Sequence, residues 1–295
     1  MHSYGGYTGY FKLMDMALDD MKKDSVALSF LMGQKQRYEY FGYTPCGAVL
    51  NYNCTGANIR HHFKEGFESK IALKEIACED TAAFDEICRR HHNMNVHMIR
   101  PKERFIDIMA TWEHRTIGVY QNDALIGYFT ADMDYGEICE LNIGGLLAEI
   151  LCIYLKQFQK DNVTIVVYSS ETALINQLSA FAESVTVQNA LSFNVLNYPA
   201  VLNAFLKLKS EITVLPEGAL TVNIKDKCNI TIAVSNNCPS VSITDNTPDL
   251  ECTHVEAMQL FFSPVSAYTL GPLERNTFAR GLFPIPLFVM SNDMS

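Results

Sequence analysis

Between residues 135 and 169 the sequence has a strand, a glycine pair, a helix and a second strand, and this order constrains the fold most. YGEICELNI and NVTIVVYS are strand-like, and GGLLAEILCIYLKQFQKD between them has the length of a long helix. Before it come the strand-like SKIALKEIA, the amphipathic EDTAAFDEICRRHH and TIGVYQNDALIGYFTADM, a hairpin turned at Asn122 and Asp123. We therefore predict an α/β unit over about residues 67–200.

The start of the chain contains a second helix–strand pattern. Gly5, Gly6 and Gly9 precede a helix-like run over residues 10–24, and the mostly apolar run Val26–Met32 has the length of a strand. The helix would present one apolar stripe at spacing i, i+3, i+4 and i+7, made of Met14, Ala17, Leu18 and Met21. The pattern predicts a glycine turn, a helix and a strand in succession.

The last third of the chain has a different pattern of predicted elements. GALTVNIKD, CNITIAVS and PSVSITD are short alternating strands joined by turn residues, and HVEAMQLFF is helix-like. They predict a small α+β domain from about residue 205. The final stretch GLFPIPLFVMSNDMS is apolar, so we expect it to pack onto the body of the protein.

Composition excludes several classes of protein. The formal net charge of −10 argues against a nucleic-acid partner. The nine cysteines contain no CxxC pair, which indicates free thiols in a reducing compartment, without a disulfide framework and without a metal site. There is no signal peptide and no apolar run of about 20 residues that would span a bilayer. We expect a cytoplasmic protein that has no membrane partner.

The glycines at the start resemble the cofactor motif of the GNAT acetyltransferases, Arg/Gln-x-x-Gly-x-Gly/Ala at a helix start. The matching stretch is Gly6-Tyr7-Thr8-Gly9-Tyr10-Phe11, with Gly9 as the central glycine. Gly6 stands at the basic position and Phe11 at the last small position, so one expected phosphate contact is missing. Free N–H groups at a helix start can bind a pyrophosphate, and glycine lets the backbone come close.

A second segment, GQKQRYEYFGY at residues 33–43, resembles the RYE-x-FGY segment of the enhanced-intracellular-survival branch of GNAT proteins. The later regions follow the order of that branch. The resemblance implies the C-terminal half of an acetyl-CoA-binding GNAT domain at 1–66, a second GNAT-like domain at 67–204 and a sterol-carrier-like domain at 205–295. The expected fold class is therefore α/β and α+β.

The resemblance also implies an activity and its residues. The chain would be an N-acetyltransferase, an acyltransferase that uses acetyl-CoA as co-substrate and a primary amine as acceptor. The backbone around Gly6, Thr8, Gly9, Tyr10 and Phe11 would bind the cofactor. Tyr38 would be the general acid that protonates the CoA sulfur, and the α-carboxylate of Ser295 would be the base.

Two alternatives stay open. A complete GNAT domain has strands before its glycine turn, whereas only four residues precede Gly5 here. We therefore expect Val26–Met32 to be an unpaired sheet edge, and activity to be impaired. The alternatives are a non-catalytic binding or scaffold protein and a lipid-binding module in the last domain. A homo-oligomer is compatible with the resemblance.

Other sequence features have structural interpretations. The pair Gly144-Gly145 has no flanking Arg or Lys and runs into apolar residues, so we interpret it as a helix start and not as a phosphate site. His91 lies among arginines, which predicts a solvated or domain-contacting helix end. Trp112, the single tryptophan, is expected in the core.

Overall fold

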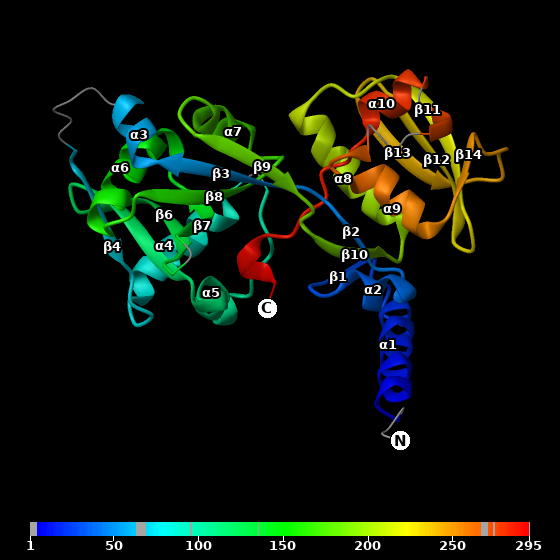
Figure 1. Cartoon of the computed structure of the whole chain (residues 1–295), viewed down its shortest axis with the longest axis horizontal. Helices are drawn as coiled ribbons and strands as arrows, with labels where there is room; N and C mark the ends of the chain where they lie inside the picture. The colour runs from blue at the N-terminus through cyan, green and yellow to red at the C-terminus, as the bar shows by residue number, and fades with distance from the viewer. Residues whose placement is uncertain are drawn as a thin grey trace. The chain divides into compact units, whose positions relative to one another are not determined.

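The computed structural model describes residues 5–62, 69–94, 96–134, 136–266, 271–273 and 275–294, without the side chains of residues 5–8, 10 and 272. The chain forms two compact units (Figure 1). Unit 1 comprises Met1–Ala48 and Gln188–Phe288, and unit 2 comprises Val49–Val187 and Val289–Ser295. Within the described ranges, no helix combines the length and the apolar character that crossing a membrane requires.

Unit 2 is built on a seven-stranded sheet in the order β4-β5-β6-β7-β8-β3-β9. The strands are β3 (Val49–Thr55), β4 (Ile71–Glu75), β5 (Arg115–Gln121), β6 (Ala124–Asp132), β7 (Glu137–Asn142), β8 (Asn162–Tyr168) and β9 (Ser184–Gln188). The pair β7 and β8 is parallel, whereas β4–β5, β5–β6, β6–β7 and β3–β8 are antiparallel. The α/β unit predicted from the sequence is confirmed, and β3 joins it from earlier in the chain.

Helices of unit 2 connect and cover these strands (Figure 1). They are α3 (Gly56–His62), α4 (Thr81–His92), α5 (Phe105–Met109), α6 (Leu147–Gln157) and α7 (Thr172–Ser179), with short 3₁₀ turns at Lys102–Arg104, Thr111–Glu113, Gly144–Leu146 and Ser291–Asp293. Helix α6 is the crossover that makes β7 and β8 parallel, because parallel neighbours need a long connection.

The core of unit 2 follows from the helical spacing of α6. Leu147, Ile150, Leu151 and Tyr154 lie at i, i+3, i+4 and i+7, and all four are 0% exposed. They pack in one cluster with the inward side chains of β8, Val163 and Ile165 among them. Burying a side chain of this size stabilises the fold by about 1.5–3 kcal/mol, so this stripe fixes α6 against the sheet.

The hairpin expected at Asn122 and Asp123 is confirmed. Gln121 of β5 pairs with Ala124 of β6, which leaves a two-residue turn. Asn122 has φ 50° and Asp123 has φ 63°, the left-handed values that a type I′ hairpin turn requires. Trp112, however, is 52% exposed, so the prediction that it lies in the core is wrong. It sits in the 3₁₀ turn before β5 with φ 61°, which turns the ring away from the core.

Unit 1 contains two smaller sheets. The first has the order β1-β10-β2 and is antiparallel, with β1 at Leu28–Leu31, β2 at Thr44–Cys46 and β10 at Leu191–Val195. The second has the order β13-β12-β11-β14, with β11 at Gly218–Ile224, β12 at Cys228–Ser235, β13 at Cys238–Ile243 and β14 at Leu250–Cys252. The helices of unit 1 are α1 (Gly5–Lys23), α2 (Lys35–Tyr38), α8 (Tyr198–Ile212), α9 (His254–Phe262) and α10 (Thr277–Leu282).

The opening glycines lie inside helix α1, not in a turn before it. The helix begins at Gly5 and includes Gly6 and Gly9, so the predicted glycine turn is wrong. The amphipathic run ends in Lys22 and Lys23, where cations suit the helix dipole. The helix that this run forms extends back through the glycines. Only about the first four N–H groups of a helix lack an intrahelical acceptor.

Strand β1 is not unpaired, contrary to the expectation for Val26–Met32. Residues Leu28–Leu31 pair with Val195–Ser192 of β10, a strand from far later in the chain. The pairing was missed because it joins segments more than 160 residues apart. β1 remains at one edge of its sheet.

The three-part division expected at residues 66 and 204 stays a prediction. The two compact units cut the chain differently, at residues 48, 187 and 288. The boundary expected after residue 204 falls within helix α8.

Candidate functional site

The parallel strands β7 and β8 diverge along their length. They pair only at Glu137 with Thr164 and Ile138 with Ile165. Beyond those pairs β7 stays bonded to β6 up to Asn142, and β8 stays bonded to β3 up to Tyr168. The two strands therefore open into a crevice at their carboxyl ends, the end of an open parallel sheet where ligands usually bind.

A pocket of about 650 Å³ lies at the carboxyl ends of these strands. Its wall comes from the end of β7, the glycine pair before α6, the start of α7 and the segment after Phe288. The lining side chains include Leu141, Asn142, Ile143, Gly144, Gly145, Glu171, Leu174 and Met290. All of them belong to unit 2.

The glycine pair leaves the backbone open to the pocket. A side chain at Gly144 or Gly145 would meet no atom within 4 Å. Gly144 has φ +59°, which favours glycine because L side chains are strained there. The pair forms the 3₁₀ turn Gly144–Leu146 that leads into α6. The predicted helix start is confirmed, and the pair also lines a pocket, which the sequence did not indicate.

Glu171 is the ionisable side chain of this pocket. Burial raises the pKa of its carboxyl group to about 7, although the backbone N–H of Tyr168 donates to Glu171 Oε2 over 2.8 Å and acts in the opposite direction. Glu171 immediately precedes α7, just beyond the end of β8. A carboxyl with this pKa is poised to accept a proton near neutral pH.

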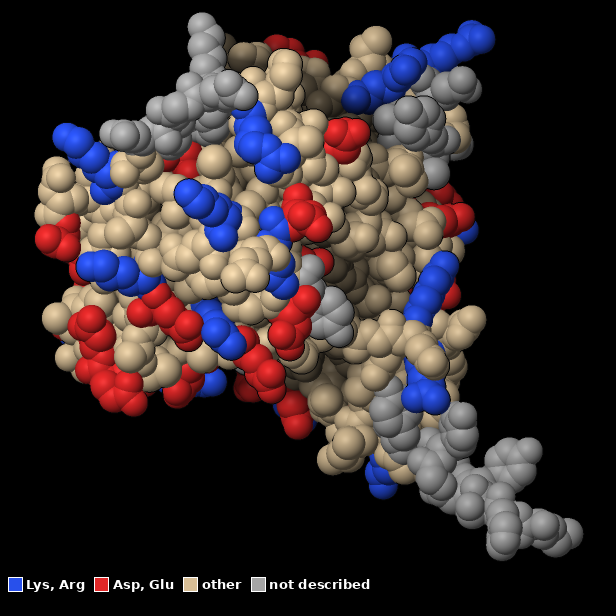
Figure 2. Space-filling model, turned by 60° about the vertical axis from the view of Figure 1, so that its left-hand side comes forward, with Lys and Arg blue, Asp and Glu red and all other residues tan. Residues whose placement is uncertain are grey.

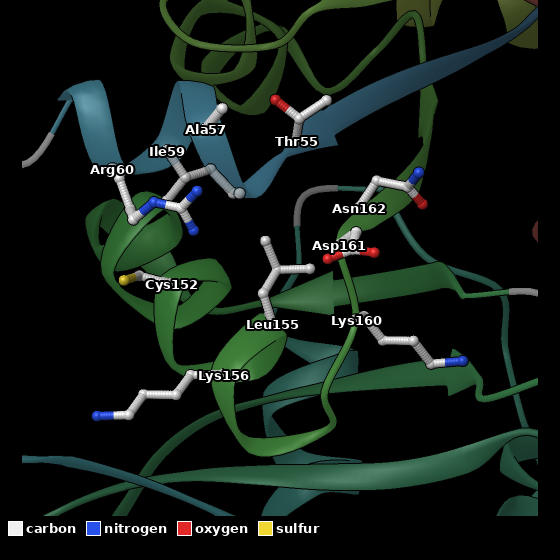
Figure 3. Close-up of a pocket in the computed structure, with 11 residues that line it drawn as sticks. Thr55, Ala57, Ile59, Arg60, Cys152, Leu155, Lys156, Lys160, Asp161 and Asn162 are labelled. Atoms are coloured by element: carbon white, nitrogen blue, oxygen red, sulfur yellow. The ribbon is translucent and has the colours of Figure 1, made fainter.

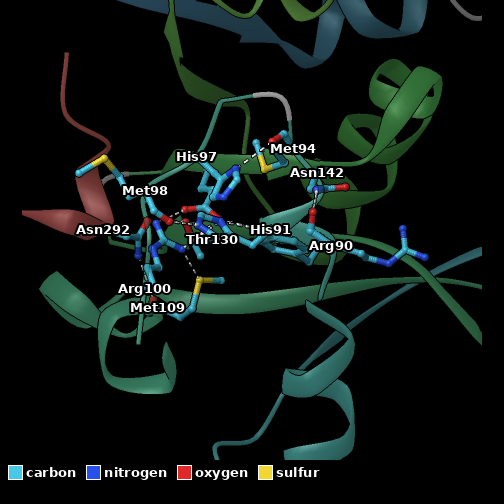
Figure 4. Close-up of polar contacts among 12 residues, drawn as sticks. Arg90, His91, Met94, His97, Met98, Arg100, Met109, Thr130, Asn142 and Asn292 are labelled. Carbon is cyan, nitrogen blue, oxygen red and sulfur yellow. Dashed lines mark hydrogen bonds and ion pairs between the residues drawn. The ribbon is translucent and has the colours of Figure 1, made fainter. Parts of the chain in front are cut away.

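A buried charge cluster of unit 2 is centred on Arg100 (Figure 4). Arg100 Nη2 lies 2.7 Å from Glu140 Oε2 and 2.7 Å from Asp293 Oδ2, and Arg100 Nε donates to Asp293 Oδ1 over 2.8 Å. Tyr128 donates to Glu140 Oε1 over 2.7 Å. Burial opposes ionisation of Glu140, but hydrogen bonding to His91 and the charge of Arg100 outweigh it and lower the pKa of Glu140 to about 2.

His91 belongs to this cluster, so the prediction of a solvated or domain-contacting helix end is wrong. Its side chain is 0% exposed. His91 Nε2 donates to the Met98 carbonyl over 2.9 Å, and Nδ1 lies 3.3 Å from Glu140 Oε1. The arginines misled the prediction because Arg100 turns inward to pair with two acids. A buried arginine needs such acid partners, because an unpaired charge in the interior is strongly destabilising.

The segment that follows Phe288 is held by three side chains in succession. The Ser291 N–H donates to the Tyr168 hydroxyl over 2.8 Å. Asn292 is 0% exposed, accepts a hydrogen bond from Thr130 and donates to the Met109 carbonyl over 3.0 Å. Asp293 completes the cluster through Arg100. The expectation that the apolar tail packs onto the body is confirmed for these residues.

Tyr38, the expected general acid, lies at the end of α2 in unit 1. Its ring packs in a cluster with Phe11 of α1, Phe41 and Tyr43. The Tyr38 and Tyr43 rings are 6.4 Å apart, and Phe11 lies 5.3 Å from Phe41. The structure therefore brings the RYEYFGY segment against α1. The catalytic role of Tyr38 stays a prediction.

The other expected site residues are placed only in part. The side chains of Gly6, Thr8 and Tyr10 and the whole of Ser295 lie outside the described residues. Since α1 begins at Gly5, the N–H groups of Gly9, Tyr10 and Phe11 fall in its hydrogen-bonded part and only those before them face the open end. Their role in cofactor binding stays a prediction.

His254 holds the FGY segment in place within unit 1. Its Nε2 donates to the Gly42 carbonyl over 2.9 Å, and its Nδ1 accepts from the Tyr198 hydroxyl over 2.8 Å. Burial lowers the pKa of His254 to about 4, and the nearby charge of Lys227 adds to the effect. Neutral His254 thus links α8 and α9 to the turn that follows Tyr38.

A second pocket of unit 2, of about 570 Å³, lies beside α3 and the end of α6 (Figure 3). Arg60 points into it toward Leu155, but Lys156 and Lys160 extend away in opposite directions. Lys160 Nζ donates to the Met133 carbonyl over 2.7 Å. The basic residues therefore do not converge on one point, and we do not assign a site here.

Charged side chains of both signs share the face of the molecule that Figure 2 shows. On the face in Figure 2, acidic and basic side chains are interspersed. This pattern fits the argument from net charge against a nucleic-acid backbone as partner. Across the ranges that the structure describes, no group of three or more His, Cys, Asp or Glu side chains is arranged to hold a metal ion.

No protein-family model matches the sequence, and no curated protein matches it. Solved structures do match. A GCN5-related N-acetyltransferase from Kribbella flavida covers 98% of this chain and 77% of its own, with TM-score 0.64 and 15% identity. A protein from Enterococcus faecalis V583 described as a probable N-acyltransferase covers 98% and 79%, with TM-score 0.66 and 17% identity. Eis1 from Mycobacterium abscessus covers 98% and 78%, with TM-score 0.59 and 13% identity.

At these identities the similarity shows the fold alone. The chain has the mixed α/β fold of the GCN5-related N-acetyltransferases. The predicted α/β fold class is confirmed. The activity and the sterol-carrier-like character of the last region stay predictions.

Proposed function

We propose that the chain is an acyl-CoA-dependent N-acyltransferase whose site is the crevice between β7 and β8. The observation that carries this proposal is the divergence of these two parallel strands around an open glycine pair, with Glu171 on the same pocket. Exposed backbone at Gly144 and Gly145 suits a pyrophosphate, because nothing keeps the ligand from approaching the peptide groups. The expected co-substrate is acetyl-CoA.

Glu171 supplies the proton acceptor. An amine attacks a thioester only when it is deprotonated, so a base must take its proton. Glu171 is the only ionisable residue among the described lining side chains. Its pKa of about 7 keeps a large ionised fraction at neutral pH. The negative charge would also attract a protonated amine, which fits the primary-amine acceptor expected from the resemblance.

The opening helix with Tyr38 is the rival position for the same reaction. Tyr38 and Phe11, which lies in the second turn of α1, pack against the same apolar cluster, which supports the assignment made from the sequence. The crevice is favoured because it combines a pocket, open backbone and a carboxyl of suitable pKa in one place. If the site is the crevice, substitutions in the crevice should abolish activity; if it is the opening helix, substitutions there should do so.

Titration calorimetry with acetyl-CoA tests the proposal. Gly145 and Gly9 are both open, since a side chain at either position would meet no atom within 4 Å. Gly145→Trp would fill the crevice, and Gly9→Trp would instead cover the start of α1. We expect wild type and Gly9→Trp to bind and Gly145→Trp to lose binding.

Each other result has a clear meaning. If wild type gives no heat at high micromolar acetyl-CoA, this chain does not bind the co-substrate and the proposal fails. If Gly9→Trp loses binding and Gly145→Trp keeps it, the site is the opening helix. Circular dichroism of both variants checks that each is folded.

The scaffold and lipid-binding alternatives have less support. The inward side chains of β11 and β12, including Leu220, Val222, Ile230 and Ile232, are 0% exposed. Such packing favours a filled core over a lipid tunnel. A non-catalytic scaffold also does not require a pocket such as the crevice in unit 2.

A further inference from the structure

One wall of the crevice comes from the segment after Phe288. Met290 lines the pocket together with Leu141 and Ile143 from the end of β7 and Leu174 from α7. Its side chain is 5% exposed. An unbranched thioether therefore closes a stretch of the wall that is otherwise made of these aliphatic side chains.

The three residues after Met290 fasten this wall to the strands that diverge. The Ser291 N–H is bonded to the Tyr168 hydroxyl at the end of β8. Asp293 is bonded through Arg100 to Glu140 of β7. Asn292 is bonded to Thr130 of β6. The segment thus spans from one side of the crevice to the other.

The segment Ser291–Asp293 is held by buried ion pairs, which are not required to pack a terminal segment onto a protein surface. The side chains of Arg100, Glu140 and Asp293 are 1%, 3% and 8% exposed, and charges are buried only when they are paired. Their positions relative to β7 are fixed by direct hydrogen bonds of 2.7–2.8 Å. Because Ser291, Asn292 and Asp293 are fixed in this way, Met290 directly before them is held in its place in the wall.

We propose that Met290 determines how large an acyl group the crevice accepts, and that Ser291–Asp293 fix it as a rigid wall. This inference depends on the proposed function. The wall restricts the wild-type crevice to short acyl groups. Shortening Met290 or loosening the segment admits longer ones, because the apolar side chains around Met290 can line the added space.

Calorimetric titration of acetyl-CoA and octanoyl-CoA tests the inference. The measured quantity is the ratio of the octanoyl-CoA Kd to the acetyl-CoA Kd. We expect Met290→Ala to lower this ratio at least about tenfold, the effect of burying roughly two extra methylene groups. Met290→Leu should keep the wild-type ratio because its volume is similar. Met32→Ala, at a methionine that is 55% exposed in unit 1, is the matched control.

Asp293→Asn tests the fastening without touching the pocket. It should lower the same ratio as Met290→Ala does, because the wall is then free to move. An unchanged ratio in both variants overturns the inference. A ratio that falls equally in Met32→Ala also overturns it, since the effect would not come from the wall.

Hydrogen exchange separates this inference from the proposed function. If no variant binds either thioester, the proposed function fails, and exchange by mass spectrometry still tests the wall. Asp293→Asn should raise amide exchange in peptides that cover residues 139–146 and 170–178, while the β11–β12 hairpin, which belongs to unit 1, stays unchanged. Unaltered exchange at both crevice peptides would overturn the rigid wall.

Discussion

The two units begin from a similar helix and strand pattern and reach different results. In unit 2, α6 leads into β8, which has a parallel neighbour in β7, and the two diverge around a pocket. In unit 1, α1 leads into β1, whose neighbour β10 is antiparallel. An antiparallel neighbour keeps its hydrogen bonds along the strand, so β1 and β10 stay paired over the whole of β1 and do not diverge. A helix followed by a strand is therefore not enough to make a binding site.

The units also differ in how they bury polar groups. Unit 2 buries the charges of Arg100, Glu140 and Asp293 as one paired cluster. In unit 1, burial disfavours the charged form of two groups: it lowers the pKa of His254 to about 4 and that of Lys209 to about 8. Among the described residues, the acceptors of Lys209 Nζ are the backbone carbonyls of Gly281, Leu282 and Pro284. The stability of the two units should accordingly respond differently to charge-removing variants.

The largest expected effect concerns Glu171. Glu171→Gln keeps an oxygen that can accept from the Tyr168 N–H but cannot take a proton, so kcat/KM should fall by about 10²–10⁴. In wild type, kcat/KM should rise with pH through about 7, the pKa of Glu171, because only the ionised form is a base. Rates of acetyl transfer to a primary amine between pH 5.5 and 9 measure both effects.

Glu79→Gln is the control for this variant, since Glu79 is exposed in the same unit. It should leave the rate and its pH profile as in wild type. A Glu171→Gln enzyme that retained full activity and the same pH limb would remove Glu171 from the mechanism and weaken the contrast between the units.

The next effect is on stability in unit 2. Asp293→Asn removes one of the two acids that pair with buried Arg100, while Glu140 remains, so the loss should be at most about 3–5 kcal/mol, the cost of an uncompensated buried charge. Urea unfolding at neutral pH measures the change in the free energy of unfolding. Asp245→Asn, at an exposed position, should change it little. If both variants lowered the free energy of unfolding equally, the buried cluster would contribute no more to stability than an exposed acid.

A smaller effect is expected at His254 in unit 1. His254→Ala leaves the Gly42 carbonyl without this donor and leaves the Tyr198 hydroxyl with its longer 3.5 Å bond to the backbone carbonyl of residue 254, at a cost of about 1–3 kcal/mol for a buried group left unsatisfied. The pH dependence has a definite sign. Because the pKa of His254 is about 4 in the folded state and ordinarily 6.5, the unfolded state binds more protons in that window, so stability falls as the pH drops from 6.5 towards 4.

Urea unfolding at several pH values between 4 and 7.5 checks this sign. His254→Gln offers an amide donor and acceptor without a titrating group, so it should retain more stability than His254→Ala and lose the His254 contribution to the pH slope. A wild-type slope that persists in His254→Gln would assign it to another group.

The smallest expected effect is that of Tyr38→Phe on the rate. If the crevice is the site, removing the Tyr38 hydroxyl in unit 1 should leave kcat/KM unchanged for the folded fraction of the protein. A fall of about 10²–10⁴, the usual result of losing a general acid, would place the chemistry beside α1. This variant therefore decides between the two regions most directly.

Local patterns predicted the elements of unit 2 well. The hairpin at Asn122 and Asp123 and the strand–helix–strand order around α6 depend on neighbours in sequence, and both are confirmed. Pairings between distant segments could not be predicted in this way. β10 joins β1 across more than 160 residues, and β3 joins β8 across more than 100, with nothing local to indicate either partner.

The candidate site was missed for a related reason. The glycine pair before α6 was visible, but the absence of basic neighbours argued against it as a site. The signal that could have found it is an acidic residue, Glu171, directly after the second of two strands joined by a helix, since both strand ends then meet at one edge. Burial, which raises the pKa of Glu171, cannot be read from sequence spacing.

The fastening of Asp293 has a consequence for how the protein is made. Arg100 and Glu140 leave the ribosome long before Asp293 does, since nearly 200 residues separate Arg100 from Asp293. During synthesis, which proceeds from the N-terminus, the nascent sheet must hold an arginine with one of its acids still missing. Unit 2 should therefore reach its final protection against proteases only after residue 293 has been added, and chains interrupted earlier should be the preferred clients of chaperones.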